Sequence, residues 1–394
     1  MKNIIITGGE LFNKGAQAMT FIAVDEMKRR FPDHRILVLS EMDLERPEEE
    51  HRQYAFTLTG WYPLKFAKAQ RRPLLRILCL LRSRSEFFAA EEIYRNTDLM
   101  IDISGYALGS NWSAATCNRY LDHIEFAKAF GIPMYLMPQS FGPFDFQGEE
   151  GRKIDRRIAA LLPTVRKICA REEAGVRALR ETYHLDQVVL MQDLVLNNRG
   201  VDIANIFAEQ PKLNVPQIAP NSVAVIPNQR NFAVGEGVSV ENLYIAAIER
   251  LLSAGHSVYL LSHSAMDQEI CERLKDRFAA FPSVHLLKNE LNCLEFQEAV
   301  KQFCYIVGSR FHAIVHALKN GVPCIAIGWA VKYFDLMKLF NQETYVLDVR
   351  KMSGTRQIFD AIEQMEKNHE KESAHIRERV VAVQSDDVFD IIQK

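Results

Sequence analysis

The chain opens with KNIIITGGELFNKGAQA, residues 2–18, where an apolar run is followed by a glycine-containing loop and then by a helical segment. Short apolar runs bounded by turn residues are typical of buried strands. Similar runs lie at 36–39, 99–103, 134–137, 168–170 and 188–191, and helices are expected to begin near Gly15, Ala114, Glu149 and Glu172. Strands that alternate with helices predict a parallel, doubly wound α/β sheet.

A break in this rhythm divides the chain into two halves. Residues 196–221 contain Pro211, Pro216 and Pro220 and show little periodicity, which predicts an interdomain linker. A second α/β series follows, with apolar runs at 223–226, 258–261, 284–287, 305–307 and 324–327. We therefore expect one α/β domain over 1–195, another over 222–355, and a helical tail over 356–394 that packs back across both. Two such domains facing each other predict a cleft enzyme, although a binding protein could share this architecture.

Composition excludes several classes of protein. The chain has 394 residues, 48% of them hydrophobic, and a net charge of −2, so no overall field favours nucleic acid as a partner. Its seven cysteines are scattered and never spaced as CxxC, and no cluster of metal ligands is evident, so neither a disulfide framework nor a metal site is expected. No apolar window is long enough for a bilayer, and a strand at the start leaves no room for a signal peptide, so we expect a cytoplasmic protein.

The segment VGSRFHAIVH, residues 307–316, carries the strongest chemical signal. An apolar strand ends at Gly308, and Ser309 is predicted to cap the following helix. Arg310 and His312 would then lie beside the free N–H groups of its first turn, where one anion could meet a guanidinium, an imidazole and the helix dipole. A bound anion would favour a protonated His312, which suits a general acid. The alternative is a capped core helix with a hydrogen-bonded histidine.

Four further side chains follow predicted strands. Arg171, after the run 168–170, could bind a carboxylate or phosphate through two N–H groups, or could pair with a nearby acid. Lys332, in GWAVKY, could reach the same anion, or could be a solvated surface lysine. Arg230 and His263 follow the first two strands of the second domain and face the expected cleft, but structural roles are equally open for both.

Glycine-containing loops follow three strands of the first half. They offer Gly9, Asn13 and Gly15 after the first strand, Gly105 after the run 99–103, and Gln139 after the run 134–137. Such loops at the carboxyl edge of a sheet can bind ligands, and they can equally be tight turns. Their spacing is neither GxGxxG nor that of a P-loop, so a dinucleotide site is not expected.

A basic segment interrupts this otherwise balanced chain. Between 61 and 84 there are seven Lys or Arg residues and no acid, interleaved with apolar side chains. Such a segment predicts an amphipathic helix in peripheral contact with an anionic membrane, here its cytoplasmic face. Because Pro73 interrupts it, a buried helix with a solvated basic flank is the alternative.

Together these segments resemble the polysaccharide pyruvyl transferase family. The resemblance runs from about 4 to 340 and is carried by the loop 8–16, PQSFGP at 138–143, ARE at 170–172, and above all SRFH at 309–312 followed by Lys332. It implies two facing Rossmann-like domains, as in GT-B glycosyltransferases, with acceptor contacts in the first domain and the donor site in the second. It further implies that phosphoenolpyruvate donates pyruvate, without another cofactor, to a sugar of a bacterial polysaccharide or its lipid-linked precursor, forming a ketal.

The residues fit this chemistry. Ketal formation from an enol ether requires protonation of the methylene carbon, addition of two sugar hydroxyls at C2 and departure of phosphate. We therefore expect His312 to act as acid, Arg310 and Lys332 to hold phosphate and carboxylate, and Ser309 and Arg171 to contribute further donor contacts. One alternative is a GT-B glycosyltransferase with a nucleotide-sugar donor, and another is a non-catalytic partner in carbohydrate assembly.

Overall fold

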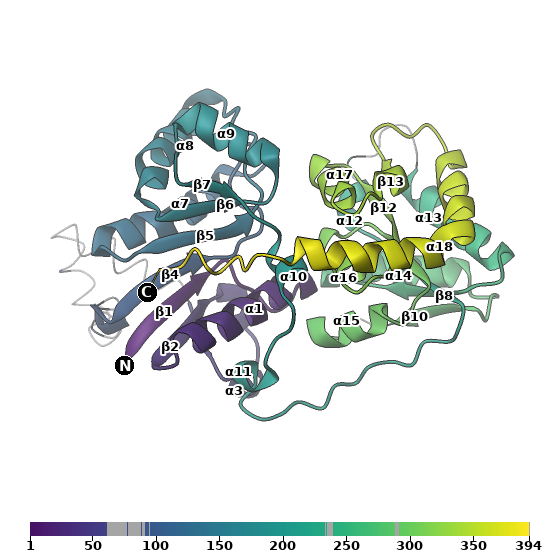
Figure 1. Ribbon diagram of the computed structural model, residues 1–394, viewed down its shortest axis with the longest axis horizontal. Helices are drawn as coiled ribbons and strands as arrows, with labels where there is room; N and C mark the ends of the chain where they lie inside the picture. The colour runs from purple at the N-terminus through teal and green to yellow at the C-terminus, as the bar shows by residue number, and fades with distance from the viewer. Residues whose placement is uncertain are drawn as a thin grey trace.

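The computed structural model describes residues 1–60, 77, 88, 91–93, 95–232, 234, 239–287 and 291–393. Within them the chain forms two α/β domains that lie side by side (Figure 1). Apart from Ile77, the basic segment 61–84 lies outside the described residues, so its membrane contact stays a prediction. No helix in the described part of the chain is long and apolar enough to cross a bilayer.

The N-terminal domain is built on a parallel sheet with the strand order β3-β2-β1-β4-β5-β6-β7 in the described residues. Its strands are β1 (Lys2–Thr7), β2 (His34–Leu39), β3 (Thr57–Thr59), β4 (Thr97–Asp102), β5 (Met134–Gln139), β6 (Lys167–Ala170) and β7 (Val188–Leu190). The helices α1 (Lys14–Arg30), α7 (Ala114–Phe130), α8 (Gly148–Leu161) and α9 (Glu173–Tyr183) connect them, with the shorter α2 (Glu41–Leu44) and α3 (Glu48–Arg52).

The C-terminal domain repeats this plan with the strand order β10-β9-β8-β11-β12-β13, again parallel throughout the part described. Its strands are β8 (Ser222–Ile226), β9 (Ser257–Leu261), β10 (Val284–Leu287), β11 (Tyr305–Gly308), β12 (Cys324–Gly328) and β13 (Val346–Asp348). Its helices are α12 (Gln229–Phe232), α13 (Val240–Ser253), α14 (Gln268–Arg277), α15 (Cys293–Val300), α16 (Phe311–Lys319) and α17 (Val331–Lys338).

The apolar runs of the sequence form these strands because the sheets are covered on both faces. All five residues of β8 are buried, as are five of the six in β1. In each sheet the strand order reverses direction beside the first strand, between β1 and β4 and between β8 and β11. Open α/β sheets bind ligands at such reversals, outside the carboxyl ends of the strands. The loops after these four strands are therefore the expected position of a site, and the predicted doubly wound fold is confirmed.

The two domains share one apolar core. A single cluster of buried side chains includes Ile4 and Ile6 of β1, much of α1, and the strands and helices of the C-terminal domain. The connecting segment begins with α10 (Leu194–Asn197), which contacts α1 and α16, and α11 (Ile203–Ile206), which packs on α1. It then runs along the lower side of the molecule in Figure 1 to reach β8. The domains are therefore joined by packing as well as by the chain.

The C-terminal tail returns to the first domain. Helix α18 (Arg356–Val383) lies on α13 and α16, and the chain after it crosses to the N-terminal domain (Figure 1). There Arg30 of α1 pairs with Asp387 at 2.5 Å and with Asp390 at 3.0 Å. Phe389, only 2% exposed, joins the shared core. The tail is therefore a second, non-covalent link between the domains.

We predict that Phe389→Ala lowers the free energy of unfolding by about 3 kcal/mol, because it removes a buried aromatic side chain from the shared core. Val381→Ala is the matched control, since Val381 is 74% exposed and its loss should change stability by less than about 0.5 kcal/mol. Urea denaturation followed by circular dichroism measures both. Equal effects of the two substitutions would contradict the anchoring role of the tail.

Candidate active site

The first loop of the N-terminal domain touches the C-terminal domain at His312. The side chain of Asn13 caps α1 by accepting a hydrogen bond from the Gly15 N–H at 3.0 Å. A Cβ atom on Gly15 would lie 2.4 Å from Nδ1 of His312, so only glycine lets the imidazole approach the helix so closely. The backbone of Asn13 also pairs with that of Ser264 in an isolated antiparallel β-bridge. This loop is therefore part of the interdomain contact.

Lys14 extends this contact into the C-terminal domain. Its Nζ donates to the carbonyl oxygen of Ser262 at 3.2 Å, and burial lowers the pKa of Lys14 to about 8. His263 lies beside it, 1% exposed, with its ring edge-on to Phe296 at 5.0 Å. Burial and the Lys14 ammonium hold the pKa of His263 well below its usual value. The prediction that His263 faces an open cleft is corrected: it is packed inside the domain interface.

A buried carboxylate joins the two domains. Asp193 Oδ2 lies 2.9 Å from Nη1 of Arg171 and 3.5 Å from Nε2 of His312. Asp193 Oδ1 accepts a hydrogen bond from the Val195 N–H at 2.9 Å and so caps α10. Burial alone would raise the pKa of Asp193, but His312, Arg171 and this N–H group hold it well below its usual range. Sequence reasoning missed Asp193, whose only local signal is that of an ordinary N-cap aspartate.

Arg171 is fixed by several partners. Its Nε donates to Ser140 Oγ at 3.0 Å and to Glu172 Oε1 at 3.1 Å, and its side chain is 4% exposed. Its guanidinium also stacks on the ring of Phe311, 4.4 Å from the centroid, across the domain interface. The structure therefore has the salt bridge that was the alternative interpretation of Arg171, with one edge of the guanidinium at the interface.

Arg310 is held by an acid of its own domain. Its Nε and Nη2 donate to the two oxygens of Asp267, at 2.7 Å and 2.6 Å, and Asp267 is fully buried. Nη1 of Arg310 has no acceptor among the described residues. Because the side chain is 15% exposed, this edge is the part of the guanidinium that remains for a ligand.

Ser309 does not cap the helix. Helix α16 begins at Phe311, with Arg310 in the capping position, and the Ser309 N–H extends the β11 ladder by donating to Ile226. Its hydroxyl lies 2.6 Å from that of Tyr244, and the residue is fully buried. The predicted cap, and with it the expected donor contact of Ser309, is therefore corrected.

Lys332 is a cation without an acidic partner in the part of the chain that the structure describes. Its Nζ lies over three aromatic rings, 5.2 Å from the centroid of Phe311, 5.7 Å from that of Tyr333 and 5.9 Å from that of Tyr106. Burial and the positive charge of Arg171 lower the pKa of Lys332 to about 7. A bound anion would restore the charged form.

Arg230 crosses to the other domain in the same manner. Its guanidinium lies 4.7 Å from the centroid of Trp112, whose ring is 5.4 Å from that of Tyr106. Tyr106 is in turn the ring nearest to Lys332 on the N-terminal side. Cations and rings from both domains thus alternate along one edge of the interface, and the structure places Arg230 there.

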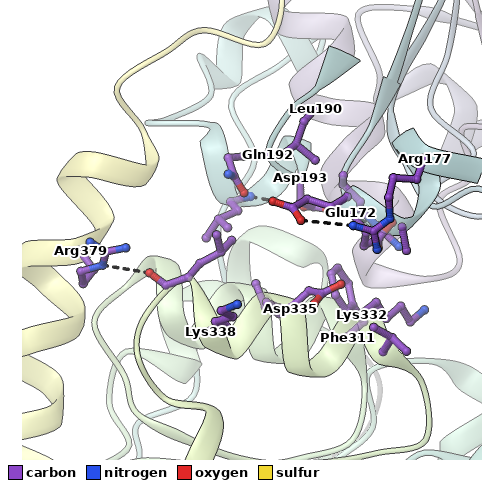
Figure 2. A pocket seen from close by; sticks show the side chains of 17 residues that line it. Glu172, Arg177, Leu190, Gln192, Asp193, Phe311, Lys332, Asp335, Lys338 and Arg379 are labelled. Carbon is purple, nitrogen blue, oxygen red and sulfur yellow. Dashed lines mark hydrogen bonds and ion pairs between the residues drawn. The ribbon is translucent and has the colours of Figure 1, made fainter. Parts of the chain in front are cut away.

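A pocket of about 350 Å³ opens between the domains beside this cluster. Figure 2 shows Glu172, Arg177 and Asp193 on one side of it, and Phe311, Lys332 and Asp335 on the helices of the other domain. The carboxyl of Asp335 has a raised pKa because of burial and the nearby charge of Glu172. The pocket therefore combines cations with acids. Among the described residues, no group of three or more His, Cys, Asp or Glu side chains is arranged to hold a metal ion.

Three other predicted residues serve the N-terminal domain itself. A Cβ on Gly9 would lie 2.9 Å from Thr20 Oγ1 and 3.1 Å from Val38 Cγ1, so this glycine permits helix–strand packing. Gly105 adopts a φ of 68°, and its carbonyl oxygen accepts from Ser140 at 2.8 Å. Gln139 is fully buried and donates to Asp102 at 3.2 Å. Their expected place in the cleft is corrected, since all three are packed inside the domain.

Solved structures of similar shape show the fold class. The chain resembles MnaA of S. aureus with UDP (TM-score 0.58, 10% identity, 99% of this chain and 94% of that one). It also resembles UDP-GlcNAc 2-epimerase of Neisseria meningitidis bound to UDP-GlcNAc (TM-score 0.57, 12% identity, 98% and 97%). A third such protein is UGT71G1 of Medicago truncatula with UDP-glucose (TM-score 0.51, 12% identity, 99% and 98%). These likenesses confirm the GT-B-like architecture and concern the fold alone.

Sequence comparison identifies the family. No curated protein sequence matches the chain significantly. A family model described as polysaccharide pyruvyl transferase matches residues 13–330, which begin at Asn13 within the first loop and end two residues before Lys332. The matched range includes Arg171, Asp193, Arg310 and His312. The chain therefore belongs to the polysaccharide pyruvyl transferase family.

Proposed function

We propose that this protein transfers pyruvate from phosphoenolpyruvate to a sugar of a bacterial polysaccharide, or of its lipid-linked precursor, as a ketal. The observation that carries the proposal is the position of His312. This imidazole of the C-terminal domain lies between Asp193 and Gly15 of the other half, beside Arg310 and in the helix turn that carries Phe311. An acid–base group therefore meets a cluster of cations where the domains join.

The donor is a small molecule with a carboxylate and a phosphate. We assign Nη1 of Arg310 and the Lys332 ammonium to these groups, because neither has an acceptor among the described residues. Arg171 adds positive charge from the N-terminal domain, although Asp193 and Glu172 already engage it. Fixed cations of this kind stabilise an anionic ligand without reorganising during the reaction.

His312 would supply the proton. Transfer of that proton to the methylene carbon makes C2 electrophilic, and one sugar hydroxyl forms a C–O bond there. The bond from C2 to the phosphate oxygen then breaks, phosphate leaves, and a second hydroxyl closes the ketal while both hydroxyl protons are released. Asp193, 3.5 Å from Nε2, stabilises the protonated imidazole and leaves Nδ1 to face the first loop.

A nucleotide-sugar glycosyltransferase is the second candidate, because UGT71G1 was solved with UDP-glucose on a similar fold. We predict that calorimetric titration detects phosphoenolpyruvate binding and no binding of UDP-glucose or UDP-GlcNAc. The physical reason is that the proposed donor contacts are cations suited to a compact anion. Binding of a UDP-sugar without phosphoenolpyruvate binding would reject the proposal in favour of the glycosyltransferase.

We predict that His312→Gln reduces phosphate release from phosphoenolpyruvate, assayed with a panel of saccharide acceptors, at least about 100-fold. Donor affinity should change much less, since the charges of Arg310 and Lys332 remain. His375→Gln, on α18, is the control and should keep full turnover. A His312→Gln enzyme with normal turnover would favour the non-catalytic partner, provided that circular dichroism shows a native fold.

Lys332 makes donor binding depend on pH. Its pKa of about 7 in the free protein means that binding an anion requires proton uptake above pH 7. Affinity for phosphoenolpyruvate should therefore be highest below pH 7 and should fall by up to about tenfold per pH unit between pH 7 and 9. Lys332→Arg, charged at every pH, should remove this slope, whereas Lys338→Arg in the same pocket should retain it. A slope unchanged in Lys332→Arg would show that another group titrates.

A further inference from the structure

A second cavity lies on the linker side of the domain interface, with a volume of about 410 Å³. Four parts of the chain line it: α1, the connecting segment from Asn198 to Ile203, the helices α15 and α16, and Gln384 just after α18. None of the donor contacts proposed above lines it. The cavity is therefore separate from the candidate active site, although α16 borders both.

The described lining side chains carry more positive than negative charge. Lys301 pairs with Glu298, the one acid among them. Arg199 donates to the carbonyl oxygen of Gln384 at 2.6 Å, and Lys319 Nζ lies 3.4 Å from Asn198 Oδ1. Neither Arg199 nor Lys319 forms an ion pair within the part of the chain described. Two cations therefore border the cavity with only neutral oxygens as partners.

A buried imidazole adds a hydrogen-bond donor to the lining of this cavity. His316, 2% exposed, lines the cavity, and neither of its ring nitrogens has a hydrogen-bond partner among the described residues. Burial, followed by the charge of Lys319, lowers the pKa of His316 to about 3, so the ring is neutral and keeps one N–H donor. A buried polar group without a partner costs free energy that a ligand or water can recover.

Apolar side chains form much of the remaining lining. They are Phe21 and Ile22 of α1, Val201 and Ile203 of the connecting segment, and Leu294 of α15. A lining that combines cations and an N–H donor with apolar side chains matches a ligand that is itself amphipathic.

We propose that this cavity binds a small organic anion, a carboxylate or a phosphate ester with an apolar part, whose charge is met by Lys319, Arg199 and His316. Such a ligand touches α1 of the first domain, the linker, and α15 and α16 of the second. Because it contacts both domains, it stabilises their arrangement in proportion to its affinity. Helix α16 also carries His312, so a ligand in this cavity contacts the same helix as the candidate active site.

The test uses the full chain with phenyl phosphate, benzoate and inorganic phosphate as probes in calorimetric titrations. Phenyl phosphate or benzoate should bind more tightly than inorganic phosphate, which lacks an apolar part. Whichever of the two aromatic probes has the higher affinity identifies the anionic group that the cavity prefers, a phosphate ester or a carboxylate. Hydrogen exchange should slow at 198–203 and in α15 when the probe is bound. Lys319→Gln should weaken this binding by about tenfold or more, because it removes the least compensated charge.

Lys301→Gln is the matched control. Lys301 lines the same cavity, but its charge is already paired with Glu298, so the affinity for the probes should change by less than about threefold. Arg199→Gln, on an exposed residue, should weaken binding as Lys319→Gln does and guards against a folding defect in the latter. The proposal is overturned if no probe protects 198–203, if both variants bind normally, or if Lys332→Gln abolishes all probe binding.

Discussion

One buried carboxylate links the two domains electrostatically, in addition to the apolar core that they share. Asp193 is 3% exposed and receives Arg171 from one side and His312 from the other. A buried charge is costly unless it is paired, and removal of one partner of such a pair costs several kcal/mol. The low pKa of Asp193 is therefore a property of the assembled interface, since His312 belongs to the second domain. The candidate acid and its electrostatic partner exist together only when the domains are joined.

The cations of the interface fall into two groups. Arg171 and Arg310 are anchored by buried acids, which fixes their geometry and uses part of their hydrogen-bonding capacity. Lys332 and Arg230 instead lie on aromatic rings of both domains. A ring face attracts a cation but accepts few of its hydrogen bonds, so the donors stay available to an incoming anion. The anchored guanidiniums would fix the position of the proposed donor, and the ring-supported cations would offer it further hydrogen-bond donors.

The sequence was most informative where burial alone determines structure. Strands buried on both faces are visible as apolar runs, whereas β3 and β13, three residues each at sheet edges, have no such signal. In the site, Arg310 and His312 stand out because they are close in sequence and follow a strand. Asp193 does not, because its partners lie far along the chain. Ser309 and Gln139 were expected in the cleft for a related reason. A polar residue after a strand can be buried in its own domain, and sequence alone does not show whether the side chain points inward or outward.

The energetics of the interface also indicate where the proposed saccharide acceptor would enter. On the linker side, α1 is held by its Asn13 bridge to Ser264 and by the Gln17 side chain, which accepts from the Cys293 N–H at 2.7 Å, within the shared apolar core. Separation there would expose that core and unpair Asp193. At the aromatic edge the described contacts include the stacking of Arg230 on Trp112, of Lys332 on Tyr106 and of Arg171 on Phe311. Each contributes about 0.5–1 kcal/mol at an exposed site and about 2 kcal/mol where it is desolvated. These contacts are weaker than the shared apolar core, so the proposed saccharide acceptor would lose the least interdomain contact by entering at the aromatic edge.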